Sequence, residues 1–273
     1  VPGFTQTPPA LEAFCRDAVS TDPATANRAI HALREQGPDG LRALLTAHAG
    51  ELEKHSVPLR VISFGPPQPD ESWLRLRAAL DAVGQQRDCF ASGLFWYTDF
   101  AKAKAAAQAQ NKPILSLRLL GKLNEEFSCA NSRFFRTTLY ANAAVAQYLS
   151  DHFILHWQSV RPVPRVTIDF GDGRKLERTI TGNSIHYVLS TDGGVVDALP
   201  GLYGAKAFVR GLQRATALTK DASAKSPEER RTLLAAYHQE RLAAPTPELQ
   251  QALQQVPAAT ATPPPDVSMT PAR

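Results

Sequence analysis

The feature that most constrains the fold is a change of pattern at Trp96, after which short apolar runs alternate with helical segments. The run from Ile114 to Leu120, opened by Lys112-Pro113, is mostly apolar and long enough for a central, buried strand. Further strands are predicted over 153–160, 166–170, 174–180, 185–189 and 195–199, and helices over 99–110, from about 129, and over 205–218. This order predicts an α/β domain with a sheet of mixed direction.

Two turns in this part of the chain predict β-hairpins. Gly171-Asp172-Gly173 separates two alternating runs, and Thr191-Asp192-Gly193-Gly194 separates two others. The first turn is rich in glycine but lacks the Lys-Ser/Thr pair and the strand-to-helix context of a phosphate-binding loop. A tight hairpin turn is therefore the prediction there.

The remainder of the chain is predicted to be helical or disordered. Residues 1–68 are predicted to form short amphipathic helices that resemble a helical repeat, with Asp22-Pro23 as a good helix start. Residues 69–95 are assigned to a connecting helix and linker after the Pro-rich stretch 64–70, and residues 96–218 to the α/β domain. A C-terminal helix is expected over 219–244, and a disordered Pro/Ala-rich tail over 245–273.

Composition narrows the classes of function. The 273 residues carry a formal charge of +4 without a basic run, so no nucleic-acid partner is expected. No apolar stretch approaches the roughly 20 residues of a membrane-spanning helix. The chain starts at Val1, as a processed or trimmed protein does, and we expect a periplasmic or otherwise exported location, with a cytoplasmic one as the alternative.

Residues 96–218 resemble the thioredoxin superfamily. The likeness lies in Lys112-Pro113-Ile114-Leu115 opening the central strand, Cys129 at a helix start, the strand from Phe153, and Asp192-Gly193 with Pro200-Gly201 beyond it. The resemblance implies a thioredoxin-like mixed sheet with flanking helices, in which Cys129 is the attacking thiol. The stretch 128–136 is also similar to that of a group of bacterial thioredoxin-like proteins.

The sequence departs from that family at three places. Ser132 replaces the second cysteine of the C-x-x-C motif, Ser184 stands near the position of the family's cis-proline, and the hairpin at 166–180 replaces a helix. A vicinal disulfide therefore cannot form, and the resemblance implies a single-cysteine route instead of dithiol chemistry.

The candidate site centres on Cys129. Unpaired amides at a helix N-terminus favour the thiolate, Ser132 is assigned as a hydrogen-bond donor to the sulfur, and Cys89 is a candidate resolving thiol or disulfide partner. Arg133, Asn183 and Ser184 are assigned to substrate binding. Cys15 lies on the apolar face of a helix and is expected to be packed.

Three functions are open at this stage. The first is a thiol–disulfide oxidoreductase acting on protein or small-molecule thiols without a cofactor, and the second is a non-catalytic scaffold that binds a protein partner through its N-terminal helices. The third is a soft-metal site, with copper as the ion and Cys89, Cys129 and His186 as ligands. His186 is included because alternation can bring it and Ser184 onto one face of a strand; a hydrogen-bonded core histidine is the alternative.

Overall fold

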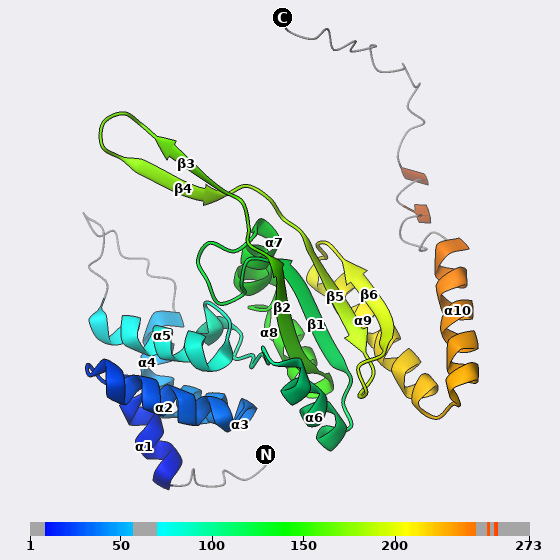
Figure 1. The fold of residues 1–273 in the computed structure, drawn as a ribbon, viewed down its shortest axis with the longest axis horizontal. Coiled ribbons are helices and arrows are strands. Elements are labelled where there is room, and N and C mark those ends of the chain that lie inside the picture. The colour runs from blue at the N-terminus through cyan, green and yellow to red at the C-terminus, as the bar shows by residue number, and fades with distance from the viewer. Residues whose placement is uncertain (1–8, 57–69, 244–249, 252–253, 256–273) are drawn as a thin grey trace, which may run out of the picture. The chain divides into compact units, whose positions relative to one another are not determined.

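The computed structural model describes residues 9–56, 70–243, 250–251 and 254–255 (Figure 1). The chain divides into two compact units, residues 1–223 and 224–273, and the second contains helix α10 (Pro227–Ala243). Most of the expected Pro-rich linker and nearly all of the expected disordered tail lie outside the described residues. Within the described part, every helix is too short or too polar to cross a bilayer.

The first unit begins with helices that share a core of their own. They are α1 (Pro9–Asp17), α2 (Pro23–Glu35), α3 (Pro38–Ala47), α4 (Ala49–Ser56) and α5 (Glu71–Gly84). Asp22 and Asp70 cap α2 and α5 through their carboxylates, as expected at a helix start. Leu33, Leu44 and Leu80 are fully buried together, so α5 belongs to the helical core and is more than a connector.

Helices α2 and α3 approach each other closely at Gly40, and this contact provides a stability prediction. A Cβ atom at Gly40 would lie 2.0 Å from the backbone oxygen of Leu33, so we expect Gly40→Ala to lower the free energy of unfolding by about 2–3 kcal/mol. A Cβ atom at Gly50 in α4 would meet nothing within 4 Å, and Gly50→Ala is expected to gain up to about 1 kcal/mol. Urea unfolding of both variants measures these changes in the free energy of unfolding, which are expected to have opposite signs. Equal changes in the two variants would contradict the close contact at Gly40.

The sheet has four strands in the order β2-β1-β5-β6. Strands β1 (Ile114–Leu120) and β2 (Ile154–Arg161) are parallel, whereas β5 (Ser184–Leu189) runs antiparallel to β1, and β6 (Val195–Pro200) antiparallel to β5. An isolated bridge joins Tyr97 to His156 at the outer edge of β2. The predicted mixed α/β sheet is confirmed, and its central strand is the apolar run after Lys112-Pro113.

Helices cover the two faces of the sheet (Figure 1). Helix α6 (Phe100–Gln110), capped by Asp99, packs Ala103 and Ala107 against Ile114 and Ile154 on one face. The opposite face meets α8 (Ala143–His152), α9 (Ala205–Ser223) and the turn η2 (Phe135–Leu139), which is π-helical and continues the short helix α7 (Ala130–Phe134).

A separate hairpin extends from the region of α7, beyond the ends of β1 and β2 (Figure 1). It consists of β3 (Arg165–Asp169) and β4 (Lys175–Thr179), joined by the predicted Gly171-Asp172-Gly173 turn. One face carries the ion pairs Arg165–Glu177 and Lys175–Asp169. The other face carries Ile168 and Phe170, which are 46% and 53% exposed, but it also carries Arg178, and the Arg174 guanidinium lies over the Phe170 ring.

Candidate functional site

Cys129 is the N-cap of α7, directly after the loop that follows the central strand. Its backbone N–H donates to the carbonyl of Leu120 at 3.3 Å, which ties the helix start to the end of β1. Its Sγ accepts a hydrogen bond from the backbone N–H of Ser132 at 3.4 Å. Cys129 therefore lies at a helix start, as predicted from the sequence.

The sulfur is fully buried. Leu120 and Val163 pack around Cys129, and the thiol donates to the backbone carbonyl of Asn183 at 3.7 Å. That contact is a hydrogen bond from the S–H group, so it exists only while Cys129 carries its proton. Conversion to a thiolate would break the bond to Asn183 and keep the one from the Ser132 amide.

The segment Thr179–Ser184, which we call the cover segment, closes the site. The Ala130 amide donates to the Thr181 carbonyl at 3.1 Å, and the Asn131 side-chain amide donates to the Ser184 hydroxyl at 2.9 Å. The Thr179 hydroxyl donates to the Ser128 carbonyl at 2.9 Å. Five hydrogen bonds, counting the one from the thiol and one from the Arg133 guanidinium to the Thr179 hydroxyl, therefore hold the cover segment against Cys129 and its neighbours.

The structure brings together five of the predicted site residues. Cys129, Ser132, Asn183 and Ser184 share the contacts above, and the Arg133 guanidinium donates to the Thr179 hydroxyl at 2.8 Å. Ser132 differs from the prediction in one respect, because it reaches the sulfur through its backbone amide. Asn183, through its backbone carbonyl, and Ser184, through its hydroxyl, contact the start of the helix.

Buried hydroxyl groups surround this helix start. Within the described part of the chain, the side-chain oxygens of Ser128, Ser132 and Thr181 are buried without a hydrogen-bond partner. Unsatisfied buried hydroxyls are costly and uncommon in proteins. Sequence reasoning singled out only Ser132 of the three.

Cys89 lies apart from this site. It begins the short turn η1 (Cys89–Ala91) and packs in the helical core, where its thiol donates to the Leu94 carbonyl at 3.5 Å. Burial, followed by the nearby Asp81 carboxylate, raises the pKa of the Cys89 thiol far above its usual range. All three cysteines are free and buried, so neither the proposed disulfide nor a nearby resolving thiol is present, and Cys15 is packed as predicted.

His186 also lies apart from the sulfur. It is buried on the same strand face as Ser184, but its Nε2 lies 2.6 Å from the Tyr140 hydroxyl, among the rings of Phe135 and Phe208. The Cys89, Cys129 and His186 side chains therefore do not form the predicted soft-metal site. His186 is instead a hydrogen-bonded core histidine, the alternative given above. His156 is one as well, because its Nδ1 lies 2.8 Å from the Ser116 hydroxyl.

The two core histidines make stability depend on pH. Burial lowers the pKa of His186 to about 3 and that of His156 to about 4, so between these values and about 6.5 the unfolded chain binds more protons than the folded one. Asp81 has the opposite effect on stability. Burial raises its pKa to about 6, so below this pH the folded chain binds one proton more at Asp81 than the unfolded chain does. We expect the free energy of unfolding to fall by about 1.4 kcal/mol per pH unit from pH 6 to 5, the net effect of one proton.

Urea unfolding at pH 5, 5.5 and 6 measures this slope. In Asp81→Asn the opposing contribution is removed, and the slope is expected to rise to about twice that value. A stability that is constant over this range in both proteins would contradict the burial of the two neutral imidazoles.

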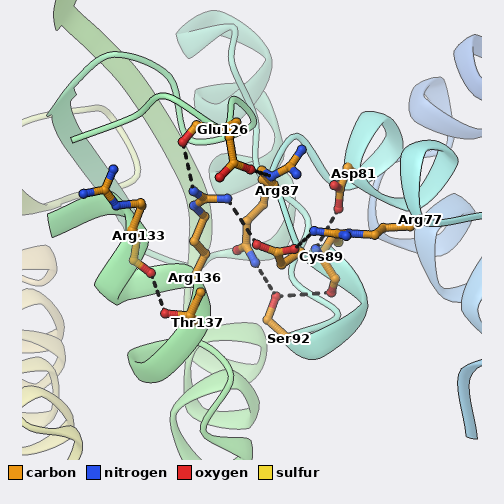
Figure 2. Close-up of polar contacts among 11 residues, drawn as sticks. Arg77, Asp81, Arg87, Cys89, Ser92, Glu126, Arg133, Arg136 and Thr137 are labelled. Carbon is orange, nitrogen blue, oxygen red and sulfur yellow. Dashed lines mark hydrogen bonds and ion pairs between the residues drawn. The ribbon is translucent and has the colours of Figure 1, made fainter. Parts of the chain in front are cut away.

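An ion network around the buried Arg136, which sequence reasoning missed, joins the α7–η2 segment to the helical region. Arg136 of η2 is 2% exposed and lies 3.1 Å from the Asp88 carboxylate, which also pairs with Arg77 of α5. A second guanidinium nitrogen of Arg136 donates to the Glu126 carbonyl at 3.4 Å, and the Glu126 side chain pairs with Arg87 (Figure 2). Three of these residues precede the α/β domain in the sequence, and no local pattern marks the pairing.

No protein-family model matches the chain, and a search of curated proteins finds no match.

Proposed function

We propose that residues 96–218 form a thioredoxin-like domain that exchanges disulfides through the single thiol of Cys129. The order of the sheet supports this proposal: a parallel pair, β1 and β2, is connected through α7 and α8, and two antiparallel strands lead into α9. Helix α6 packs on one face and the other helices on the opposite face. The resemblance of Lys112–Leu115, Cys129 and the Asp192-Gly193 turn to that family agrees with this topology.

One observation carries the chemical part of the proposal: Cys129 is the N-cap of α7, and its Sγ accepts the Ser132 amide hydrogen. A hydrogen bond from a neutral amide to an anionic acceptor is stronger than one to a neutral acceptor. The helix dipole acts in the same direction. Once the contact between the thiol and Asn183 has opened, both interactions stabilise a thiolate, which is the nucleophile in disulfide exchange.

The reaction requires one external thiol. The Cys129 thiolate attacks one sulfur of a substrate disulfide, the S–S bond breaks, and the other sulfur leaves as a thiolate that takes up a proton. The thiolate of the external thiol then attacks the substrate sulfur of the mixed disulfide, so that a new disulfide forms between this thiol and the substrate and Cys129 leaves as a thiolate. Because Cys89 is packed in the helical core, the resolving thiol comes from a protein or a small molecule.

Access to the sulfur requires a movement of the cover segment, because Cys129 is fully buried. The bonds from the thiol to Asn183 and from Asn131 to Ser184 must open before a disulfide can approach in line. Disulfide substrates belong to an oxidising compartment, and an exported location suits this activity better than a cytoplasmic one.

Incubation with excess glutathione disulfide tests the proposal. In the Cys15→Ala/Cys89→Ala variant, intact-mass analysis is expected to show one glutathione per chain, released again by a thiol. A protein that acquires no glutathione in the folded state, but does so in urea, would show that Cys129 is a sealed structural residue.

A second candidate function, a non-catalytic scaffold that binds a protein, is favoured by the hairpin. One face of the hairpin exposes Ile168 and Phe170, whereas the apolar side chains of the N-terminal helices, Leu74 apart, mostly pack into their own core. Exposed apolar patches on soluble proteins mark interaction surfaces. The scaffold function is supported if Cys129 forms no mixed disulfide and Phe170→Ser abolishes a complex that Thr167→Ser leaves intact.

A further inference from the structure

We propose that Glu51, His55 and Asp70 bind a divalent transition-metal ion, with Zn²⁺ as the best fit, and that this ion joins α4 to the start of α5. The site lies in the helical region and is independent of the thiol chemistry proposed for Cys129. Within the described residues, these three side chains form a group whose possible ligand atoms all lie within 4.8 Å of one another.

Two helices supply the ligands. Glu51 and His55 are four residues apart on α4, a spacing that places both side chains on one face of a helix. The His55 Nε2 lies 3.3 Å from the Glu51 carboxylate, so the two groups already point toward a common place. Asp70 is the N-cap of α5 and approaches from the second helix.

Contacts outside the donor set hold two of the ligands in place. The His55 ring stacks on the Trp73 ring, with centroids 4.1 Å apart and planes inclined by 11°. Trp73 is three residues beyond Asp70, whose carboxylate accepts from the Ser72 amide at 2.8 Å and from the Ser72 hydroxyl at 2.9 Å. A carboxylate has about four lone-pair positions, so Asp70 can cap α5 and coordinate a metal at the same time.

The charge of the group suits a divalent cation. Two carboxylates and a neutral imidazole give −2, which a dication neutralises. The Lys54 ammonium lies 3.0 Å from Glu51, but the Lys54 side chain is 72% exposed and can turn into solvent when an ion replaces it. Aspartate and glutamate carboxyls are ionised at neutral pH, so both groups carry their charge there.

The donor types select the metal. One imidazole nitrogen and two carboxylate oxygens are ligands that Zn²⁺ binds, and a water molecule as the fourth ligand completes a tetrahedron. Mg²⁺ and Ca²⁺ prefer sites composed of oxygen atoms alone. The buried cysteines take no part, so the site differs from the copper site considered from sequence.

Calorimetric titration of the chelator-treated full chain with ZnCl₂ tests the site. We expect one Zn²⁺ per chain, and an affinity lowered at least about 10-fold in each of His55→Phe, Glu51→Gln and Asp70→Asn. Phe at position 55 can stack on Trp73 without coordinating, and Asn at position 70 still caps α5, so these changes preserve the packing. His31→Phe, at an exposed position of α2, is the matched control and is expected to bind as the unchanged protein does.

Thermal unfolding provides a second readout. Zn²⁺ at about 100 times its Kd is expected to raise the Tm by about 5 °C, an increase that His55→Phe abolishes. The absence of stoichiometric Zn²⁺ binding would overturn the proposal. Two further results would place the ion elsewhere and also overturn the proposal. One is weaker Zn²⁺ binding in His31→Phe, and the other is unchanged binding in all three ligand variants.

Discussion

Cys129→Ser is expected to abolish disulfide exchange while leaving the fold intact. Serine fits the volume of cysteine, and its hydroxyl can accept the Ser132 amide hydrogen and donate to the Asn183 carbonyl, as the thiol does. A hydroxyl does not attack a disulfide, so the rate should fall to that of the solution without protein. Circular dichroism and the Tm should remain close to those of the unchanged chain.

The measurement is the rate of thiol release from a peptide disulfide at neutral pH, with glutathione as the resolving thiol. Cys89→Ala is the matched control, since Cys89 is also a fully buried free thiol but lies in the helical core. We expect this control to lose stability and keep the exchange rate of its folded fraction. Equal loss in both variants would assign the activity to a pair of thiols and contradict a single-cysteine route.

The cover segment explains how such a protein can react selectively. Five hydrogen bonds and the packing of Val163 keep the sulfur from solvent, so under the proposed function only the fraction of molecules with an opened segment reacts. The same contacts disfavour oxidation by small molecules in the closed state. Under the proposed function, selectivity comes from the segment that carries Asn183 and Ser184, the two residues of this segment assigned to substrate binding from the sequence.

Most elements could be predicted from sequence because their signals are local. The apolar run behind Lys112-Pro113 became β1, Asp99 capped α6, and the Gly171-Asp172-Gly173 turn closed the β3–β4 hairpin. The position of Cys129 at a helix start was equally local. Each of these features depends on residues within a few positions of one another.

The arrangement of the candidate site could not be predicted, because it depends on contacts between residues that are far apart in the sequence. His186 was expected near the sulfur from strand alternation, but a tyrosine 46 residues earlier in the chain binds its ring in the core. Cys89 was expected as a resolving thiol, but η1 folds onto α5, where Gly84 leaves room for its sulfur. The metal-ligand group likewise depends on Asp70 meeting a helix that ends at Ser56.

Replacement of Arg136 is expected to cause the largest loss of stability. Arg136→Met retains the aliphatic part of the side chain and removes the guanidinium, which leaves the mostly buried Asp88 carboxylate with Arg77 as its remaining ion-pair partner. Removal of one partner of a buried ion pair costs about 3–5 kcal/mol. Because Arg77 still compensates part of the charge, we expect a loss near the lower limit, about 3 kcal/mol.

The double variant Arg136→Met/Asp88→Asn distinguishes an uncompensated charge from lost packing. If the stranded carboxylate causes the loss, its neutralisation should recover at least about 1 kcal/mol relative to Arg136→Met, measured by urea unfolding at neutral pH. No recovery would assign the cost to packing alone.

The same ion pair is expected to affect the reactivity of Cys129. Arg136 belongs to η2, which continues α7, and Asp88 precedes η1, so removal of this pair should make the start of α7 open more often. Faster alkylation of Cys129 in Arg136→Met than in the unchanged chain, in buffer without denaturant where both remain folded, is the expected sign of that coupling.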